Sequence, residues 1–227
     1  MLSGRTKLVG LIGNPVEHSL SPEMQNAAFA ARGLDWAYVP LLVEHGRVQQ
    51  ALNGLVALGF VGANVTAPHK MEVAELCGST LASVNTLVVR EAGIEAVSTD
   101  AAILDSLDFE RAAVIGDGGA AAGFLQVVDD VTQFSRRTMW PPDVSGADLV
   151  IHATSERDEI VCAVAEGQTL IDLPYPETAT GRAAREAGAR VITGEEVLVA
   201  QGAAAFELWT GISAPVEVMR AAVGLTG

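Results

Sequence analysis

The chain has 227 residues, of which 49% are hydrophobic and 19% charged, so it can form a packed core and is not a disordered or low-complexity protein. Its 28 acidic and 14 basic residues give a formal net charge of −14, which repels phosphate backbones and anionic lipid head groups. We therefore expect neither nucleic acid nor a membrane surface as a partner. No apolar stretch approaches the roughly 18 uninterrupted residues of a membrane span.

The cysteines indicate a reducing compartment. Cys77 and Cys162 lack CxxC spacing, and each lies among aliphatic residues as a small core hydrophobe does. We expect a soluble, cytoplasmic protein, either a monomer or a homodimer.

No His/Cys cluster has metal-ligand spacing and no G-x-S-x-G motif is present, so we expect no metal and no serine-hydrolase mechanism.

The first half of the chain alternates short β-branched runs with Ala-rich segments of helical length, which is typical of an α/β protein with a largely parallel sheet. Ser21 is the expected N-cap of the first helix, because Pro22 suits the first helical position. The predicted elements are a strand over 7–12, that helix up to Gly33, strands over 36–43 and 60–65 flanking a helix over 49–58, a helix from Pro68 to about Gly78, and a hairpin of 83–89 with 94–97.

The second half begins near residue 101, where we predict a domain boundary. Its predicted elements are a short helix over 101–107, a strand over 112–115, a helix over 120–128, strands over 131–135 and 149–153, a helix, a strand over 169–173, a helix, a strand over 190–192, and helices over 195–209 and 215–223. Only residues 136–148, with Pro141 and Pro142, separate two presumed parallel strands. A parallel crossover usually needs a dozen or more residues, mostly helical, so this crossover helix is expected to be missing or vestigial.

A glycine-rich turn follows the strand over 112–115. Gly116, Gly118 and Ala121 fit G-x-G-x-x-G/A between a strand and a helix, where backbone N–H groups can meet a pyrophosphate. A glycine-rich turn without any ligand is the alternative. Asp117 would repel a pyrophosphate unless its side chain points outward.

Two arginines stand about 20 residues further on, where an NAD-binding protein would carry an acidic group for the ribose 2′-hydroxyl. Arg136 and Arg137 favour a 2′-phosphate instead, and hence NADP rather than NAD. The alternative is that they form a solvated strand end.

Lys70 is one of two lysines against twelve arginines. It lies in the first turn of a predicted helix, where a cation opposes the helix dipole by roughly 0.3 to 1 kcal/mol. An unfavourable charge in a chain that seldom uses lysine suggests that Lys70 has a functional role. It could exchange a proton with a substrate hydroxyl while Asp100 holds the amine in place. A plain exposed amine is the alternative.

Ser19 and Ser21 form S-x-S before a predicted helix, and hydroxyls beside free N–H donors make a reasonable carboxylate site. Ser21 already has the N-cap role, so Ser19 is the more discriminating residue. His18 is interpreted as an ordinary loop residue rather than a base.

Together these segments resemble the shikimate dehydrogenase family, whose members reduce 3-dehydroshikimate with NADPH. The similarity runs from about Leu8 to the C-terminus, and its most specific parts are GNPVEHSLSPEMQN (13–26), GANVTAPHK (62–70), SVNTL (83–87), STD (98–100), GDGGAA (116–121) and VLVAQGAAAFELWTG (197–211). The resemblance implies an α/β protein with a mixed, mostly parallel sheet in an N-terminal domain and a reduced Rossmann-like second domain. The implied divisions are a substrate-binding and catalytic domain over 1–103, an NADP-binding domain over 104–198, and C-terminal helices over 199–227 that pack back on the first domain.

The resemblance also implies residue roles. The family's catalytic lysine and aspartate correspond to Lys70 and Asp100. The residues implied to bind substrate are Ser19 and Ser21 for its carboxylate, helped by Tyr175, and Thr66, Asn85 and Gln201 for its ring hydroxyls. The residues implied to bind the cofactor are Arg136 at the 2′-phosphate, with Ser135, Gly116, Gly118, Gly119, Ala120 and Thr154.

Departures from the family pattern gather in the cofactor half. Asp117 stands where the family usually has alanine, and Glu195 and Glu196 lie in a run that normally includes glycine and methionine near the nicotinamide. The chain is also shortened over 136–148 and between Lys70 and Asn85. The substrate half thus looks intact and the cofactor half altered, although Ser98 and Gln25 replace the family's usual asparagine and histidine.

The expected reaction is the reversible NADP-dependent reduction of 3-dehydroshikimate to shikimate, in the precursor pathway of the aromatic amino acids. One alternative is a related dehydrogenase of quinate or an aminated shikimate analogue, because Ser19, Thr66 and Tyr175 do not separate these substrates. The other is a shikimate-binding protein with impaired cofactor binding.

Overall fold

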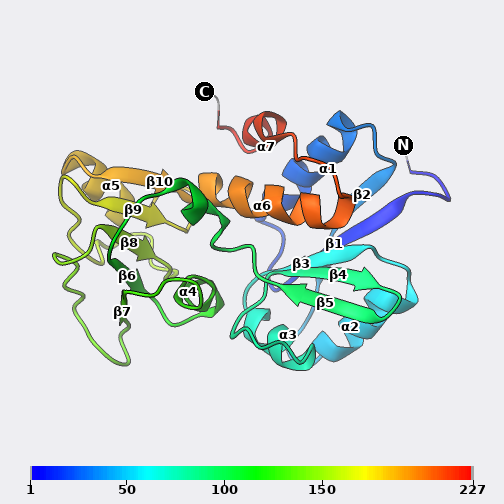
Figure 1. The fold of residues 1–227 in the computed structure, drawn as a ribbon, viewed down its shortest axis with the longest axis horizontal. Coiled ribbons are helices and arrows are strands. Elements are labelled where there is room, and N and C mark those ends of the chain that lie inside the picture. The colour runs from blue at the N-terminus through cyan, green and yellow to red at the C-terminus, as the bar shows by residue number, and fades with distance from the viewer. Residues whose placement is uncertain (1, 226–227) are drawn as a thin grey trace. The chain divides into compact units, whose positions relative to one another are not determined.

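The computed structural model describes residues 2–225, which form two compact units (Figure 1). One unit contains the residues up to Asp100 and those from Val199 onward, and the other is Ala101–Leu198. Each unit contains one five-stranded sheet. In the described part of the chain, no helix has the length and apolar character needed to cross a bilayer.

The first unit is built on a mixed sheet in the order β2-β1-β3-β4-β5. Strands β1, β2 and β3 are parallel, whereas β4 runs antiparallel to β3 and β5 antiparallel to β4. Their bounds are β1 Lys7–Gly13, β2 Trp36–Leu42, β3 Gly62–Val65, β4 Thr86–Arg90 and β5 Gly93–Val97. This topology brings the carboxyl ends of β1, β3 and β5 and the amino end of β4 to the same edge of the sheet.

Helices cover both faces of this sheet (Figure 1). They are α1 Ser21–Ala31, α2 Val48–Ala57, α3 Lys70–Leu76, α7 Val216–Ala222 and the part of α6 (Gly194–Thr210) from Val199 onward. Leu52 of α2 and Val73 of α3 share a buried cluster with Ile12 of β1. On the other face Phe29 of α1 stacks on Phe206 of α6, with ring centroids 5.5 Å apart. The predicted mixed, mostly parallel sheet is confirmed.

The second unit is built on an all-parallel sheet in the order β10-β9-β8-β6-β7. Its strands are β6 Ala112–Ile115, β7 Val131–Phe134, β8 Leu149–His152, β9 Thr169–Asp172 and β10 Arg190–Thr193. The chain passes from β6 to β7 on one side and then to β8 on the other side of β6. This reversal is a topological switch point, the place where open α/β sheets bind ligands beyond the carboxyl ends of their strands.

Alternate side chains of each strand reach opposite faces of this sheet. Ala112 and Val114 pack with α4 (Gly119–Leu125) and the 3₁₀ helix η1 (Ala102–Ser106), while Ala113 and Ile115 face α5 (Ala179–Glu186). On the α5 side, coil residues complete the core: Val144, Val161, Cys162 and Val164. Apolar loops therefore cover a face on which crossover helices would otherwise lie.

Two sequence predictions concerned these crossovers. The expected loss of the helix between β7 and β8 is confirmed, since none of residues 135–148, all described, is helical. The helix predicted between β8 and β9 is wrong, because residues 153–168, also all described, contain none. Side chains satisfy this segment's backbone instead: Glu156 accepts three N–H groups and Thr180 Oγ1 accepts that of Val161.

Several predicted boundaries also need correction. Ser21 is not the N-cap of α1: Leu20 occupies that position without a side-chain cap, and the Ser21 N–H donates to Ser19 Oγ at 3.2 Å. The helix predicted from Pro68 begins at Lys70, and the helix predicted over 101–107 is the 3₁₀ helix η1. Because helix ends depend on local capping, they are the least predictable part of such elements.

The two cysteines differ in burial and give a first prediction. Burial, with the nearby charge of Asp172, raises the pKa of Cys162 to about 12, whereas Cys77 is partly exposed and burial raises its pKa less. Since the thiolate is the reactive form, we expect a chromogenic disulfide reagent at mildly alkaline pH to modify Cys77 slowly and Cys162 only after unfolding. Release of two chromophore equivalents from the native protein would contradict this.

Candidate active site

Lys70 and Asp100 form a close ion pair at the shared edge of the first sheet. Lys70 Nζ lies 2.6 Å from Asp100 Oδ1 and 2.7 Å from Oδ2. Lys70 is the first residue of α3, just beyond β3, and Asp100 follows β5, whose carboxyl end lies at the same edge. Their side chains are 12% and 11% exposed. The carboxylate thus compensates the amine at a helix start, and the pair remains accessible enough to meet a ligand.

Asn85 holds the aspartate in place. Its Nδ2 lies 3.0 Å from Asp100 Oδ1, and its Oδ1 accepts the backbone N–H of Thr99 at 2.7 Å. The same amide lies 3.1 Å from Gln201 Oε1 on α6. The structure therefore brings together Lys70, Asp100, Asn85 and Gln201, four residues that the sequence predicted for one site.

A second layer of polar side chains supports Asn85. Tyr38 on β2 donates its hydroxyl to Asn64 Oδ1 at 2.8 Å. Asn64 on β3 in turn donates to the backbone oxygen of Asn85 and to Thr86 Oγ1, both at 3.0 Å. Sequence reasoning missed this network. Its signal was an asparagine inside a wholly buried strand, since a buried amide requires partners.

His69, also missed, fixes the start of α3. It is fully buried, and its Nε2 donates to the backbone oxygen of Val43 at 2.7 Å. Because Lys70 is the next residue, this bond anchors the backbone that carries the amine. A histidine beside the candidate lysine was the available signal.

The remaining predicted substrate residues of this unit lie at the same edge, two in loops and Ser21 at the first position of α1. Ser19 follows β1 and is half-buried, Ser21 is 5% exposed, and Thr66 follows β3 directly. The loops are joined because the Asn14 N–H donates to Ala67 O at 3.1 Å. Tyr175, the other predicted substrate residue, is a half-buried residue of the second unit, in the loop after β9. His18, which was interpreted as an ordinary loop residue, is exposed.

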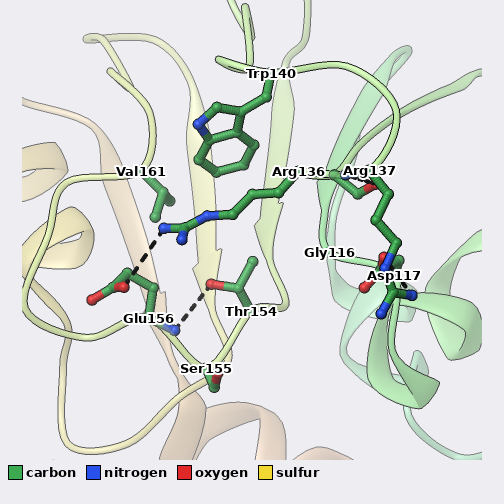
Figure 2. A pocket seen from close by; sticks show the side chains of 10 residues that line it. Gly116, Asp117, Arg136, Arg137, Trp140, Thr154, Ser155, Glu156 and Val161 are labelled. Atoms are coloured by element: carbon green, nitrogen blue, oxygen red, sulfur yellow. Dashed lines mark hydrogen bonds and ion pairs between the residues drawn. The ribbon is translucent and has the colours of Figure 1, made fainter.

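The second unit has a cleft of about 350 Å³ at its topological switch point. Its walls come from the segments after three parallel strands: Gly116 and Asp117 after β6, Ser135, Arg136, Arg137 and Trp140 after β7, and Thr154, Ser155, Glu156 and Val161 after β8 (Figure 2). The cleft thus contains the predicted residues Gly116, Ser135, Arg136 and Thr154. Gly118, Gly119 and Ala120 lie next along the chain, at the start of α4.

Arg136 extends between an aromatic ring and a carboxylate (Figure 2). Its guanidinium carbon lies 5.3 Å from the centre of the Trp140 ring, and its Nη2 lies 3.8 Å from Glu156 Oε2. The Arg136 side chain is 65% exposed, so one face remains open to a ligand. Trp140 was not predicted as a site residue. It comes from the loop that replaces the crossover helix.

Asp117 turns toward an arginine. Its Oδ2 lies 3.3 Å from Arg137 Nη1, and its side chain is 43% exposed. The sequence predicted that Asp117 would repel a pyrophosphate unless its side chain pointed outward. The ion pair with Arg137 partly offsets that repulsion, because the carboxylate has a cationic partner in the cleft wall. It also occupies one of the two arginines that were expected to hold a phosphate.

The residues of this cleft fit a dinucleotide. Gly116 has φ +139°, and a Cβ there would lie 2.7 Å from Ala153 O, so glycine keeps the turn tight against β8. A Cβ at Gly118 would meet open space within 4 Å, which leaves backbone there accessible to a phosphate. Arg136 offers a guanidinium face for a base or a 2′-phosphate.

A buried polar network supports Thr154 at the cleft wall. His152 and Asp172, both fully buried, are joined by His152 Nδ1 donating to Asp172 Oδ1 at 2.8 Å. In the neutral ring, His152 Nε2 then accepts the Thr154 hydroxyl at 2.7 Å. Thr178, the N-cap of α5, donates both its N–H and its hydroxyl to Asp172. This network fixes the ends of β8 and β9.

Residues 2–225 contain no group of three or more His, Cys, Asp or Glu side chains arranged to hold a metal ion.

Comparison with known proteins places these two sites in a family. Residues 11–87 match the model of the shikimate dehydrogenase substrate binding domain, and residues 194–223 match that of the shikimate 5′-dehydrogenase C-terminal domain. The shikimate dehydrogenase (NADP(+)) of Anaeromyxobacter dehalogenans strain 2CP-C is 38% identical, over 95% of each chain.

Solved structures agree in fold. A shikimate dehydrogenase in complex with NADP+ has a TM-score of 0.87 at 29% identity, covering 100% of this chain and 98% of that one. The shikimate 5-dehydrogenase of Thermus thermophilus, in complex with NADP(H) and shikimate, has a TM-score of 0.79 at 25% identity, covering 96% and 98%. With a lysine–aspartate pair at the edge of one sheet and an arginine cleft at the switch point of the other, the chain belongs to the shikimate dehydrogenase family.

Proposed function

We propose that this protein catalyses the reversible, NADP-dependent reduction of 3-dehydroshikimate to shikimate. The observation that carries the proposal is the Lys70–Asp100 pair, held by Asn85 at a sheet edge that also presents Ser19 and Thr66. A relative 38% identical over nearly the whole chain is named shikimate dehydrogenase (NADP(+)), which supports the same reaction here.

The proposal divides the work between the two units. Residues 1–103 would bind substrate and carry the catalytic pair, residues 104–198 would bind NADP, and the helices of 199–227 would complete the first unit. The contacts of Gln201 with Asn85 support the last assignment, since they link α6 to the catalytic pair.

Lys70 is the proposed acid and base. As shikimate is oxidised, the neutral amine accepts the proton of the reacting hydroxyl, and in reduction the ammonium returns a proton to the carbonyl oxygen. Asp100 orients the amine through its two short contacts, and Asn85 prevents the carboxylate from turning away. NADP supplies the hydride acceptor in one direction and the hydride donor in the other.

The remaining roles concern binding. Ser19 and Ser21 lie beside the start of α1, and their hydroxyls would bind the substrate carboxylate, helped by Tyr175. Thr66, Asn85 and Gln201 would bind ring hydroxyls, because their side chains offer both donors and acceptors. Ser135, Arg136 and Thr154 would bind the cofactor with the backbone of Gly116, Gly118, Gly119 and Ala120.

The direct test is to mix purified protein with shikimate and either NADP or NAD, and to follow the reduced nicotinamide by absorbance, with quinate as the parallel substrate. We expect turnover with shikimate and NADP. Faster turnover with quinate would instead favour the related dehydrogenase. No turnover, together with a rise in the melting temperature on adding shikimate, would favour the binding protein with an impaired cofactor site.

A further inference from the structure

Glu156 is a fixed negative charge in the wall of the cofactor cleft. Its Oε1 accepts the backbone N–H groups of Arg157 at 3.0 Å, Asp158 at 3.2 Å and Glu159 at 3.3 Å. These bonds, those from Asp158 and Glu159 foremost, hold the pKa of the Glu156 carboxyl below its usual range, and the charge of Arg136 adds to the effect. The carboxylate is therefore ionised at neutral pH and cannot swing freely away from the cleft.

The second oxygen of this carboxylate faces Arg136. Glu156 Oε2 lies 3.8 Å from Arg136 Nη2 (Figure 2). The other acidic residue of the cleft, Asp117, lies on the opposite side of the Arg136 guanidinium and pairs with Arg137. The cleft therefore presents two arginines and two carboxylates. Each guanidinium already has a carboxylate partner that partly neutralises its charge toward a bound anion.

A 2′-phosphate on Arg136 would have to approach a guanidinium that Glu156 already faces. A phosphate monoester carries between about 1.5 and 2 negative charges at pH 7, whereas the ribose 2′-hydroxyl of NAD carries none. Like charges brought close together in a partly desolvated cleft repel each other. The pyrophosphate is common to NAD and NADP, so repulsion at the 2′ position acts only on the cofactor that carries a 2′-phosphate. It therefore affects the preference between the two cofactors rather than binding in general.

We propose that Glu156 is a specificity-determining residue that limits the preference of this protein for a cofactor with a 2′-phosphate over one with a free 2′-hydroxyl. The inference deepens the proposed function and rests on it, because it assigns the cleft to the adenosine end of NADP. Arg136 attracts the 2′-phosphate, stacks on Trp140 and is partly neutralised by Glu156. The balance of these contacts sets how strongly the two cofactors are distinguished.

The test measures binding of two fragments that lack the nicotinamide: 2′,5′-ADP, which carries the 2′-phosphate, and 5′-AMP, which does not. Isothermal titration calorimetry on the full chain compares the natural protein with Glu156→Gln. Glutamine keeps an oxygen that can accept the three backbone N–H groups, so the loop is preserved while the charge is removed. We expect 2′,5′-ADP to bind about three- to tenfold more tightly to the variant and 5′-AMP to change less than about twofold.

Two further variants complete the experiment. Glu159→Gln removes the same charge from an exposed residue of the same loop that does not line the cleft, so we expect little change in either affinity. Arg136→Met is expected to abolish the difference between the two fragments. The gain in Glu156→Gln should shrink at high salt, because salt screens charges in an open cleft.

The outcomes separate the two proposals. A Glu156→Gln variant whose ratio of the two affinities equals that of the natural protein would overturn the role of Glu156, while leaving the proposed reaction intact. An equal gain from Glu159→Gln would overturn it too, since the effect would then reflect net charge alone. If the natural protein binds neither fragment and shows no turnover, both this inference and the proposed function fail.

Discussion

Replacing Lys70 by alanine is expected to lower kcat for shikimate oxidation about 10²- to 10⁴-fold, the range that a positioned general acid or base contributes. The amine lies within 2.7 Å of both oxygens of Asp100 and is 12% exposed, so no other described lysine can take its place. The loss should fall mainly on kcat. Shikimate should still bind, with affinity only modestly reduced, because its carboxylate and ring hydroxyls are assigned to other side chains.

The chain offers a matched control, since its only other lysine is Lys7. Lys7 is exposed at the start of β1, the end of that strand opposite the site, with its amine 5.4 Å from the Trp36 ring centre. Lys7→Ala should keep near-normal turnover. Steady-state kinetics gives kcat for both variants, and the shikimate-induced rise in melting temperature reports binding. Retained turnover in Lys70→Ala would rule out the proposed role.

Replacing Asp172 by alanine is expected to lower the free energy of unfolding of the second unit by about 3–5 kcal/mol. The carboxylate is fully buried and accepts from His152 Nδ1 and from the N–H and hydroxyl of Thr178. Without the carboxylate, these buried donors lose their acceptor. The N-cap of α5 and the end of β8 would lose their common anchor.

Asp129→Ala is the control for this substitution, because Asp129 is an exposed aspartate of the same unit. We expect that variant to unfold within about 0.5 kcal/mol of the natural protein. Denaturant unfolding followed by circular dichroism measures both. If Asp172→Ala is insoluble, Asp172→Asn supplies a milder change that keeps one acceptor. An unfolding midpoint for either Asp172 variant equal to that of the control would contradict the structural role assigned to this network.

Much of the fold followed from local pattern. The strand over Ala112–Ile115 was predicted residue by residue, and the hairpin of β4 and β5 was predicted from its turn, because buried β-branched runs bounded by glycine are strong signals. The prediction of a helix between β8 and β9 was wrong because side chains compete there for the backbone hydrogen bonds that a helix would use. There Glu156 and Thr180 satisfy backbone N–H groups from the side, a competition that helical periodicity does not reveal.

The candidate site residues were likewise predictable where the signal was local. The sequence by itself determined which functional groups are candidates for the site. These are Lys70, a lysine in a chain where lysine is rare, the S-x-S of Ser19 and Ser21, the glycine turn at Gly116, and Arg136 in place of an acidic residue. These signals are local, since each depends on residue type and spacing within one segment.

Only the tertiary structure decided what surrounds those groups. Asn85 meets Asp100 and Gln201 across separations of 15 and 116 residues, and Tyr38 supports Asn64 from another strand. Glu156 faces Arg136 because β8 lies beside β6, and β6 beside β7, in the sheet order. Hydrogen bonds and charges act over a few ångströms in space, so contacts between distant segments leave no regular mark in the sequence, and strand order alone brings them into reach.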